Sequence, residues 1–337
     1  MNVIAPNAPL DYDAIVMHWI DGHIDLAYIA LQGRNILETC SESEKACISI
    51  PDLEKSPIST FFGTIYTSQI DKTCGYGASS DREAAFAAGA KQLEIYKQLE
   101  LNGHLSIQRS GCNCSDSLSM LLLMEGGDPI RSPEDVRWWS KQGLRIVGLT
   151  WSSGTRYAGG NDCNNGISDE GIELVAALDE HNIVHDASHL SDQALDDLFS
   201  STNETIVASH SNSRTVLKNQ SQRHLKDEHA KEIFRRGGVI GLNLYTQFLS
   251  QTFDKENTDA TIADCVEHIM YYCDLAGNKT QVALGSDFDG GFPTTYLPIN
   301  LKHPNQVCNL AEALVVAGFS DEDLASFARG AWMRVLN

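Results

Sequence analysis

His23 and Asp25 stand two residues apart in the segment DGHIDL, residues 21–26. In an extended strand, side chains at positions i and i+2 project to the same face, so this imidazole and this carboxylate can converge on one point. Both groups are ligands for a metal ion such as Zn²⁺. A single His-x-Asp pair is a weak indication, because such pairs are more often hydrogen-bonded or solvated. A metal site would need further ligands from elsewhere in the chain.

Further imidazoles and carboxylates follow other apolar segments. They are Glu125 after LSMLLLM, His189 after NIVHDAS, His210 after ETIVAS and Asp287 after TQVALGS. Each of these groups can bind a metal ion or transfer a proton. Whether they meet depends on the elements that carry them.

The apolar and β-branched segments alternate with segments of helical periodicity, and no linker rich in Pro, Gly or Ser divides them. We predict eight strands, at residues 18–26, 60–66, 118–126, 145–151, 182–189, 204–211, 238–245 and 280–287. Several helices begin at residues suited to N-capping: Ser132, Ser168, Ser191 and Ser320, the last with Asp323. This alternation predicts a (β/α)8 TIM-type barrel, as one domain over residues 1–337 with N-terminal and C-terminal extensions.

In such a barrel the carboxyl ends of the strands meet at one mouth, where active sites lie. His23, Asp25 and the four later groups would come together there, although they are far apart in sequence. Burying unpaired ionisable groups is costly, so a purely structural barrel has no reason to repeat them at its strand ends. The pattern therefore favours a metal or acid–base site at the mouth.

The composition argues against some classes of partner. The chain has 337 residues, 42% of them hydrophobic, and a formal net charge of −20, which is unfavourable for binding nucleic acid or an anionic membrane surface. The N-terminal residues lack the order of a secretory signal and no apolar run reaches membrane-spanning length, so we expect a cytoplasmic protein. Nine cysteines, scattered from Cys40 to Cys308, favour reduced thiols. Cys112 and Cys114 could form a soft metal site, but they lack a second Cys or His pair nearby.

Seven segments carry a family resemblance when taken together. In chain order they are DGHIDL (21–26), MEGGDPI (124–130), GLTW (148–151), DASHLSD (186–192), SHSNSR (209–214), GGVIGLNLY (237–245) and ALGSDFDGG (283–291). Their order and spacing resemble the membrane (renal) dipeptidase family, zinc-dependent peptidases of the amidohydrolase superfamily. The resemblance implies a hydrolase that cleaves the amide bond of dipeptides.

The resemblance also implies two Zn²⁺ ions per chain, bridged by Glu125 and a hydroxide. His23, Asp25 and Glu125 would bind one ion, and Glu125, His189 and His210 would bind the other. Two such cations lower the pKa of the water between them, which supplies a nucleophile at neutral pH.

Two more residues would act on the substrate if the resemblance holds. Asp287, the first aspartate of GSDFDG, would take the proton of the attacking hydroxide and pass it to the leaving amine. Arg223 would contact the substrate carboxylate or the developing tetrahedral oxygen, for which a guanidinium has suitable charge and geometry. Alternatives remain open, because Asp289 could be the acid–base residue and Arg223 could be an ordinary surface arginine. We prefer Asp287 because it lies nearer the strand end.

His181, His185 and His189 have the i, i+4, i+8 spacing of a helical zinc-binding face. A strand that starts near Ile183 interrupts such a helix, so we predict that His181 ends a helix and that His185 is a packed histidine. The other histidines are predicted to be structural or solvated: His18, His104, His224, His229, His268 and His303.

Trp151 departs from the family pattern, in which GLT is usually followed by a histidine that helps to bind and polarise the substrate carbonyl. An indole has one N–H donor, no acceptor and no charge, so it cannot simply replace an imidazole. Three explanations are open: a changed substrate preference with Trp151 in the binding site, a neighbour such as His185 or Arg156 acting instead, or a weakened dipeptidase. The segment after Asp289 is also atypical.

Three functions follow from these observations. The first is a binuclear zinc dipeptidase that acts on a small dipeptide, with a homodimer as one candidate assembly. The second keeps the metals but acts on another small carbonyl compound, such as an N-acyl amino acid or a lactone, since a shared fold does not fix the substrate. The third is a metal-binding protein that is catalytically weak or silent, against which an intact Asp287 argues.

Overall fold

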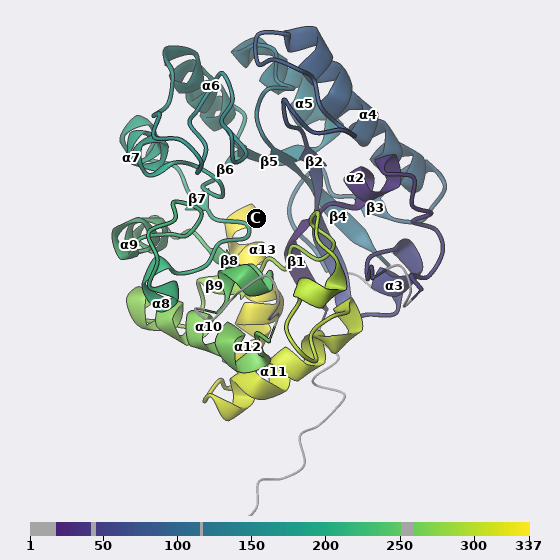
Figure 1. Ribbon diagram of the computed structural model, residues 1–337, viewed down its shortest axis with the longest axis vertical. Coiled ribbons are helices and arrows are strands. Elements are labelled where there is room, and N and C mark those ends of the chain that lie inside the picture. The colour runs from purple at the N-terminus through teal and green to yellow at the C-terminus, as the bar shows by residue number, and fades with distance from the viewer. Residues whose placement is uncertain (1–17, 42–44, 115–116, 251–258) are drawn as a thin grey trace, which may run out of the picture.

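Eight parallel strands form a nearly closed barrel in the computed structural model, which describes residues 18–41, 45–114, 117–250 and 259–337 (Figure 1). The strands of the barrel are β1 (Trp19–Ile24), β2 (Ile58–Tyr66), β4 (Ser119–Glu125), β5 (Leu144–Gly148), β6 (Val184–Asp186), β7 (Ile206–Val207), β8 (Ile240–Leu242) and β9 (Val282–Leu284). Their order is β7-β6-β5-β4-β2-β1-β9-β8, and a parallel bridge from Ala208 to Ile240 joins the two ends. The (β/α)8 prediction is therefore confirmed, and each predicted strand overlaps an observed one.

One further strand was not predicted. β3 (Ser106–Ile107) pairs with β4 outside the path of the barrel. With two residues it is too short for an alternating pattern to show in the sequence. The predicted N-terminal extension falls on residues 1–17, which lie outside the described residues.

Helices follow the strands and surround the barrel (Figure 1). They are α2 (Leu26–Leu31), α3 (Ile50–Glu54), α4 (Arg82–Leu101), α5 (Val136–Gln142), α6 (Asp169–Glu180), α7 (Asp192–Ser201), α8 (Arg214–Leu217), α9 (Asp227–Arg235), α10 (Ile262–Ala276), α11 (Val307–Val316), α12 (Asp321–Ala325) and α13 (Ala331–Leu336). Short 3₁₀ turns cover Pro133–Asp135, Thr246–Phe248, Thr294–Tyr296 and Pro304–Gln306, and the π-helical segment Ser326–Gly330 joins α12 to α13.

The predicted N-caps are confirmed at three of four positions. The hydroxyls of Ser168, Ser191 and Ser320 each accept a hydrogen bond from the backbone N–H three residues further on. Ser132 is different, because its hydroxyl donates to Glu134 at 2.5 Å and makes no capping bond. The proline that follows Ser132 begins a 3₁₀ turn, so the helical pattern starts there without a side-chain cap.

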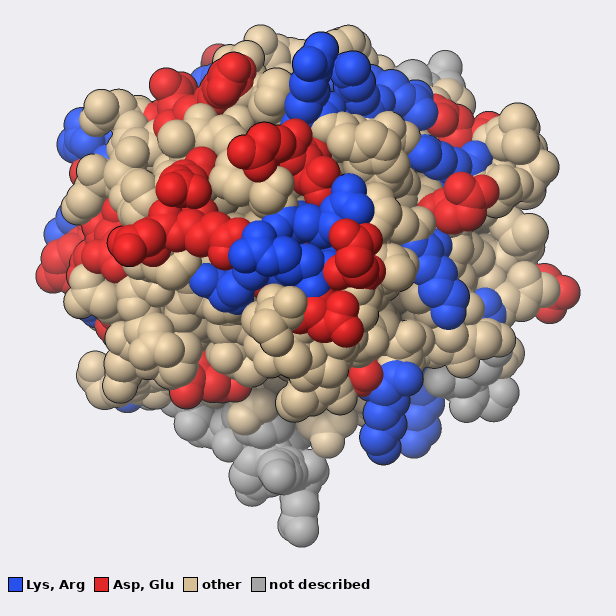
Figure 2. Space-filling model, turned by 90° about the horizontal axis from the view of Figure 1, so that it is seen from above, with Lys and Arg blue, Asp and Glu red and all other residues tan. Residues whose placement is uncertain are grey.

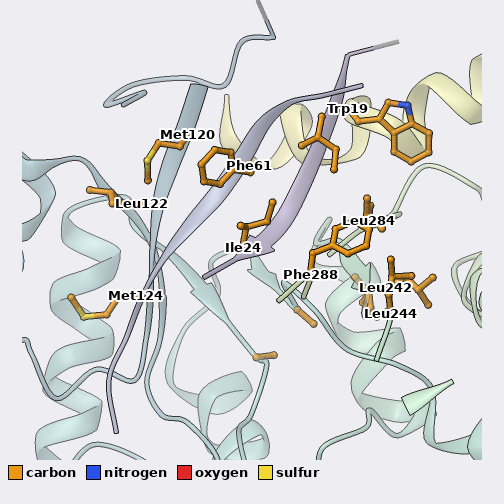
Figure 3. Packing of buried hydrophobic residues seen from close by; sticks show 14 of the residues in the cluster. Trp19, Ile24, Phe61, Met120, Leu122, Met124, Leu242, Leu244, Leu284 and Phe288 are labelled. Carbon is orange, nitrogen blue, oxygen red and sulfur yellow. The ribbon is translucent and has the colours of Figure 1, made fainter. Parts of the chain in front are cut away.

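β4 shows how the barrel divides its apolar side chains. Leu122 and Met124 belong to the cluster between the strands and the helices (Figure 3), whereas Leu121 and Leu123 belong to the cluster inside the barrel. Because both faces of the strand are buried, the segment reads as a continuous apolar run. The inward alternation continues to Glu125, so the fold directs this carboxylate toward the interior of the barrel.

The C-terminal helix fills the amino-terminal end of the barrel. Trp332 of α13 is fully buried in the inner cluster, and its indole N–H donates to the carbonyl of Leu284 at 2.9 Å. Gly22 and Gly241 leave room for the indole, since a Cβ atom on either would lie 2.6 or 3.0 Å from Trp332 Cζ2. The apolar end of the barrel is thus closed, and polar groups gather at the other end.

A β-bulge in β1 sets the direction of its polar side chains. Between Asp21 and Ile24, β1 contains one residue more than the paired segment of β2. The Asp21 carboxylate accepts the backbone N–H of His23 at 3.2 Å within the bulge. The extra residue shifts the alternation, so that His23 and Asp25 face the interior while Ile24 packs in the outer cluster.

The surface and the thiols bear on two of the sequence predictions. Among the described residues, no helix is long and apolar enough to cross a membrane. On the face in Figure 2, Lys and Arg side chains lie in small groups with Asp and Glu side chains among them, so this face has no continuous basic strip. All nine cysteines are free, and within the described chain neither Cys112 nor Cys114 belongs to a group of three potential metal ligands.

Candidate active site

A cavity of about 370 Å³ opens at the carboxyl ends of the strands and is lined by every site residue predicted from the sequence. These residues are His23, Asp25, Glu125, Trp151, His189, His210, Arg223 and Asp287. The sequence did not single out the other lining residues, which are Tyr28, Tyr66, Asp71, Tyr245, Phe248, Gly290, Gly291 and Phe292. The barrel therefore brings together residues from almost the whole length of the chain.

The imidazole of His23 faces two carboxylates. Its Nε2 atom lies 3.8 Å from Asp25 Oδ2 and 3.8 Å from Glu125 Oε2. Thr64 on β2 donates its hydroxyl hydrogen to the other oxygen of Asp25, which fixes the orientation of that carboxylate. A separation of 3.8 Å is too long for a hydrogen bond, but it suits atoms that share one cation.

Glu125 joins this group to two further imidazoles. Its Oε1 atom lies 3.0 Å from His189 Nε2 and 3.4 Å from His210 Nε2, and the two Nε2 atoms are 3.1 Å apart. Because Oε2 faces His23, the two oxygens of one carboxylate face two different sets of candidate metal ligands. The ligand atoms of His23, Glu125 and His210 lie within 4.8 Å of one another, as do those of His23, Asp25 and Asp287.

The imidazoles of His189 and His210 are oriented through their Nδ1 atoms. Asn161 Oδ1 lies 2.9 Å from His189 Nδ1, and Ser209 Oγ lies 2.7 Å from His210 Nδ1. Ser209 donates its single hydroxyl hydrogen to Asp186, so it must accept a hydrogen from His210 Nδ1. With hydrogen on Nδ1, each Nε2 atom presents a lone pair toward the carboxylate between them and toward a metal ion.

This donor set fits zinc. The three imidazoles and three carboxylates are only 1–9% exposed, and a divalent cation would offset the cost of burying the carboxylates. Without a cation, burial raises the pKa of Glu125 to about 8 and that of Asp287 to about 7. Burial, together with nearby positive charge, holds the pKa of His189 and of His210 well below the ordinary value. The neutral imidazole that results is the form that binds a metal ion.

Two of these groups stand on unusual backbone. His189 has a φ of 67° and Asp287 a φ of 60°, in the left-handed region that side chains rarely adopt. Both residues come just after a strand, where the chain turns to begin the next segment. Such strained positions cluster at functional sites, where the surrounding structure holds them.

Asp287 and Asp289 occupy different environments. Asp287 lines the cavity, and its Oδ2 atom accepts a hydrogen bond from Asn243 Nδ2 at 2.8 Å. Asp289 is not in the lining, since it pairs with Arg34 at 2.7 Å and accepts the backbone N–H of Cys47. Asp289 therefore anchors the segment around Cys47, which agrees with the preference for Asp287 as the residue that faces the substrate.

Arg223 is buried, so the alternative of a surface arginine is wrong. Its Nη2 atom donates to the carbonyl of His210 at 2.8 Å, and its Nη1 atom donates to the Ser211 hydroxyl at 3.2 Å. The guanidinium also lies over the ring of Phe248, with its carbon 5.1 Å from the ring centroid. These contacts fix a positive charge at the wall of the cavity.

Trp151 lines the cavity, with its ring centroid 5.3 Å from that of Tyr66 and 6.0 Å from that of His189. The proposed substitutes for the missing histidine are both engaged elsewhere. His185 bonds to Asp179 at 2.6 Å, as expected of a packed histidine, and Arg156 pairs with Asp128 at 3.1 Å. Neither residue lines the cavity, so the interpretation that one of them replaces the histidine is wrong.

The helical zinc face that the histidine spacing suggests does not form. His181 follows α6 as its C-cap, His185 lies in β6 and His189 lies in the loop beyond. The expectation that His181 ends a helix is confirmed.

Residues that position the candidate metal ligands were harder to recognise than these candidates. Asp186 and Ser209 lie inside segments that were singled out for their histidines, and Asn243 directly follows the apolar residues of β8. A polar residue at the point where an apolar strand segment is interrupted could therefore have indicated these positions. Asn161 and Asp71 lie in loops, where periodicity marks no position.

The similarity of this chain to known proteins extends over most of its length. The model of the membrane dipeptidase family (peptidase family M19) matches residues 14–337. Dipeptidase aclJ of Aspergillus oryzae is 28% identical over 224 residues, which are 65% of this chain and 51% of that protein. An uncharacterised protein in the pqqA 5′ region of Klebsiella pneumoniae is 28% identical over 262 residues, 73% of this chain and 94% of that protein. The chain thus spans about half the length of aclJ but nearly all of the Klebsiella protein.

Solved structures agree with the fold. A metallo peptidase from Rhodobacter sphaeroides, liganded with a phosphinate mimic of the dipeptide L-Ala-D-Ala, has a TM-score of 0.82 at 21% identity and covers 95% of this chain and 98% of its own. The probable dipeptidase PvdM from Pseudomonas aeruginosa has a TM-score of 0.82 at 16% identity and covers 96% of each chain. Because the family model matches nearly the whole chain, the protein belongs to the membrane dipeptidase family and is a hydrolase of the metallopeptidase class.

Proposed function

We propose that this hydrolase is a binuclear zinc dipeptidase. The observation that supports it best is the position of Glu125, whose two oxygens face separate sets of ligands. His23 and Asp25 would hold one Zn²⁺ ion with Glu125, and His189 and His210 would hold the second with the same carboxylate. When bound, the zinc ions supply Lewis-acid chemistry and activate water at neutral pH.

Asp287 is the residue that we assign to proton transfer. Asn243 holds one of its oxygens, which leaves the other oxygen to take a proton. Asp287 takes a proton from the attacking water and delivers it to the leaving amine nitrogen as the C–N bond breaks. Its burial favours this role, because desolvation raises the pKa of the Asp287 carboxyl group toward neutral pH, where a group exchanges protons readily.

Arg223 would hold the carboxylate of the substrate. Within the described lining of the cavity, it is the side chain with a permanent positive charge, and its Nε atom has no partner. A fixed guanidinium with donors to spare suits a carboxylate. Dipeptides and N-acyl amino acids both carry that group, whereas a simple lactone does not, so the charge favours the first two classes.

Metal analysis and a substrate panel test the proposal. We expect about two zinc ions per chain after expression with zinc, since one bridging carboxylate joins two sites. Turnover of dipeptides should disappear on chelation and return when zinc is restored. Zinc binding with turnover of only N-acyl amino acids or lactones would assign the second substrate class. Zinc binding without any turnover would leave a catalytically silent protein, and a chain without zinc would refute the proposal.

A further inference from the structure

Asp71 is a carboxylate of the cavity that belongs to neither group of potential metal ligands among the described residues. It follows β2 and lines the cavity together with Tyr28 and Tyr66. Its side chain is partly exposed, so a substrate in the cavity can reach it. Neither the metal site nor the proton transfer described above makes use of this group.

Hydrogen bonds hold the Asp71 carboxylate in its ionised form. Its Oδ1 atom accepts the backbone N–H groups of Thr73 at 2.6 Å and Cys74 at 2.8 Å, and its Oδ2 atom accepts the Tyr28 hydroxyl at 2.9 Å. Burial raises the pKa of Asp71, but these hydrogen bonds outweigh it and leave the pKa below its ordinary value. Oδ2 keeps room for a second donor, and in the described part of the chain neither Lys nor Arg neutralises the charge.

A row of aromatic rings leads from Asp71 toward the metal ligands. The ring centroids of Tyr28 and Tyr66 are 5.2 Å apart, those of Tyr66 and Trp151 are 5.3 Å apart, and Trp151 lies 6.0 Å from the ring of His189. The face of an aromatic ring attracts a cation, and indole does so most strongly. A histidine in place of Trp151 could become protonated and repel a cation, whereas an indole cannot.

Arg223 lies on the opposite side of the barrel from Asp71. Asp71 follows β2, whereas Arg223 bonds to the backbone of His210, which follows β7. Three strands separate β2 from β7 in either direction around the barrel: β4, β5 and β6 one way, and β1, β9 and β8 the other. One wall of the cavity is therefore negative and aromatic, and the wall across from it is positive.

We propose that Asp71 and the faces of Tyr28, Tyr66 and Trp151 bind an ammonium group of the substrate, so that the enzyme selects substrates with a cation at one end and a carboxylate at the other. The inference rests on the dipeptidase function proposed above and specifies its substrate. The ammonium has two sources, the α-amino group of the dipeptide or a basic side chain such as that of lysine. Because Asp71 lies across the cavity from Arg223, the N-terminal residue would carry this charge, across the cleaved bond from the carboxylate.

Asp71→Asn tests the inference because it keeps the shape of the side chain and removes its charge. Three substrates separate the sources: Lys-Gly carries both ammonium groups, norleucyl-Gly carries only the α-ammonium, and N-acetyl-norleucyl-Gly carries neither. We expect kcat/KM to fall about tenfold, mainly through KM, for substrates with the bound ammonium, as for the loss of one charged hydrogen bond. If kcat/KM falls for Lys-Gly alone, the bound ammonium is that of the lysine side chain. If it falls equally for Lys-Gly and norleucyl-Gly, the bound ammonium is the α-amino group.

The third substrate and a control variant show whether Asp71 is merely structural. N-acetyl-norleucyl-Gly should be cleaved equally well by the variant and the unaltered chain. Glu38→Gln removes an exposed carboxylate outside the cavity and should change none of the three rates. The same fall for all three substrates, or no fall for any of them, would overturn the inference.

The unaltered enzyme separates failure of this inference from failure of the proposed function. If the unaltered enzyme cleaves the peptides and Asp71→Asn shows the same relative kcat/KM values for them, the inference about the ammonium site is wrong and the dipeptidase proposal stands. If it cleaves none of them, the dipeptidase proposal fails, and ammonium binding is then measured by calorimetric titration of the zinc-loaded protein with lysine. In that titration Asp71→Asn should weaken binding about tenfold, and equal affinity in both proteins would overturn the inference.

Discussion

Replacing Ser209 by alanine should weaken zinc binding although no ligand is removed. The Ser209 hydroxyl accepts a hydrogen bond from His210 Nδ1 at 2.7 Å and donates one to Asp186 at 2.5 Å. These two bonds fix the tautomer in which His210 Nε2 carries a lone pair. In Ser209→Ala the imidazole loses this partner, and the carboxylate of Asp186 loses a donor inside a buried site.

The expected loss of zinc affinity follows from the hydrogen bonds that the Ser209 hydroxyl makes. Loss of the outer partner of a metal-binding histidine lowers metal affinity by about 10–100-fold, or about 1.4–2.8 kcal/mol. We expect Ser209→Ala in the upper part of this range, because Ser209 is 0% and Asp186 2% exposed, so water cannot readily take the place of the hydroxyl. Asp186→Asn should have a similar effect. An amide N–H would donate to Ser209 and reverse the hydrogen bonds, which would put the hydrogen on His210 Nε2.

Zinc affinity is measured on metal-free protein by competition with a chromophoric chelator, and ¹⁵N chemical shifts of His210 report its tautomer. Ser200→Ala, at an exposed serine of α7, is a matched control that should leave the affinity unchanged. Ser209→Thr keeps a hydroxyl and should keep most of the affinity. Unchanged affinity in both Ser209→Ala and Asp186→Asn would refute the reasoning, as would hydrogen on His210 Nε2 in the unaltered metal-free chain.

Three further predictions concern catalysis, specificity and pH. Asp287→Asn should keep its zinc, measured by elemental analysis, but lower kcat at least about a hundredfold, and an active variant would place proton transfer elsewhere. Trp151→His should lower kcat/KM on Lys-Gly about fivefold relative to N-acetyl-norleucyl-Gly, as for the loss of one aromatic face beside the ammonium; a lower Tm with unchanged relative rates would make Trp151 a packing residue. Burial lowers the pKa of His268 from 6.5 to about 4, so the unfolded chain binds the proton more readily, and stability should fall by up to about 3 kcal/mol as the pH falls through that window. Urea unfolding measures the free energy of unfolding at pH 7 and at about pH 4.5. The decrease between these pH values should be smaller for His268→Asn than for the unaltered chain, and an equal decrease would contradict this assignment.

The barrel could be predicted because its strands are buried on both faces. A segment such as LLLM in β4 has to be apolar at every position, and the break in that run at Glu125 marks the place where the strand leaves the core. The same break occurs after β6, β7 and β9, where His189, His210 and Asp287 follow. Helix starts at Ser168, Ser191 and Ser320 were likewise readable, since a cap depends on residues only three positions apart.

Features that depend on distant partners could not be read in this way. The bulge in β1 exists only in relation to the register of β2, so the sequence of β1 alone does not show which face His23 takes. Asn161 contacts His189, which lies 28 residues further along, across a loop without periodicity. Asp71 acquires its environment from Tyr28, a residue of α2 that the fold brings beside it. In each case the position is set by packing between elements rather than by a local pattern.

The buried carboxylate of Asp21 lies between the apolar end of the barrel and the candidate active site. Just beyond it, Gly22 makes room for the indole of Trp332, and the bulge that follows turns His23 toward the cavity. Asp21 Oδ1 accepts the N–H of His23 at 3.2 Å and the N–H of Ser286 at 2.8 Å, so it joins β1 to the segment after β9. Ser286 immediately precedes the proposed proton-transfer residue, and His23 is the imidazole nearest in sequence to this anchor. A single carboxylate therefore holds a proposed metal ligand and the proposed proton-transfer group at a fixed separation, and burial raises its pKa only to about 6, which leaves it ionised at neutral pH.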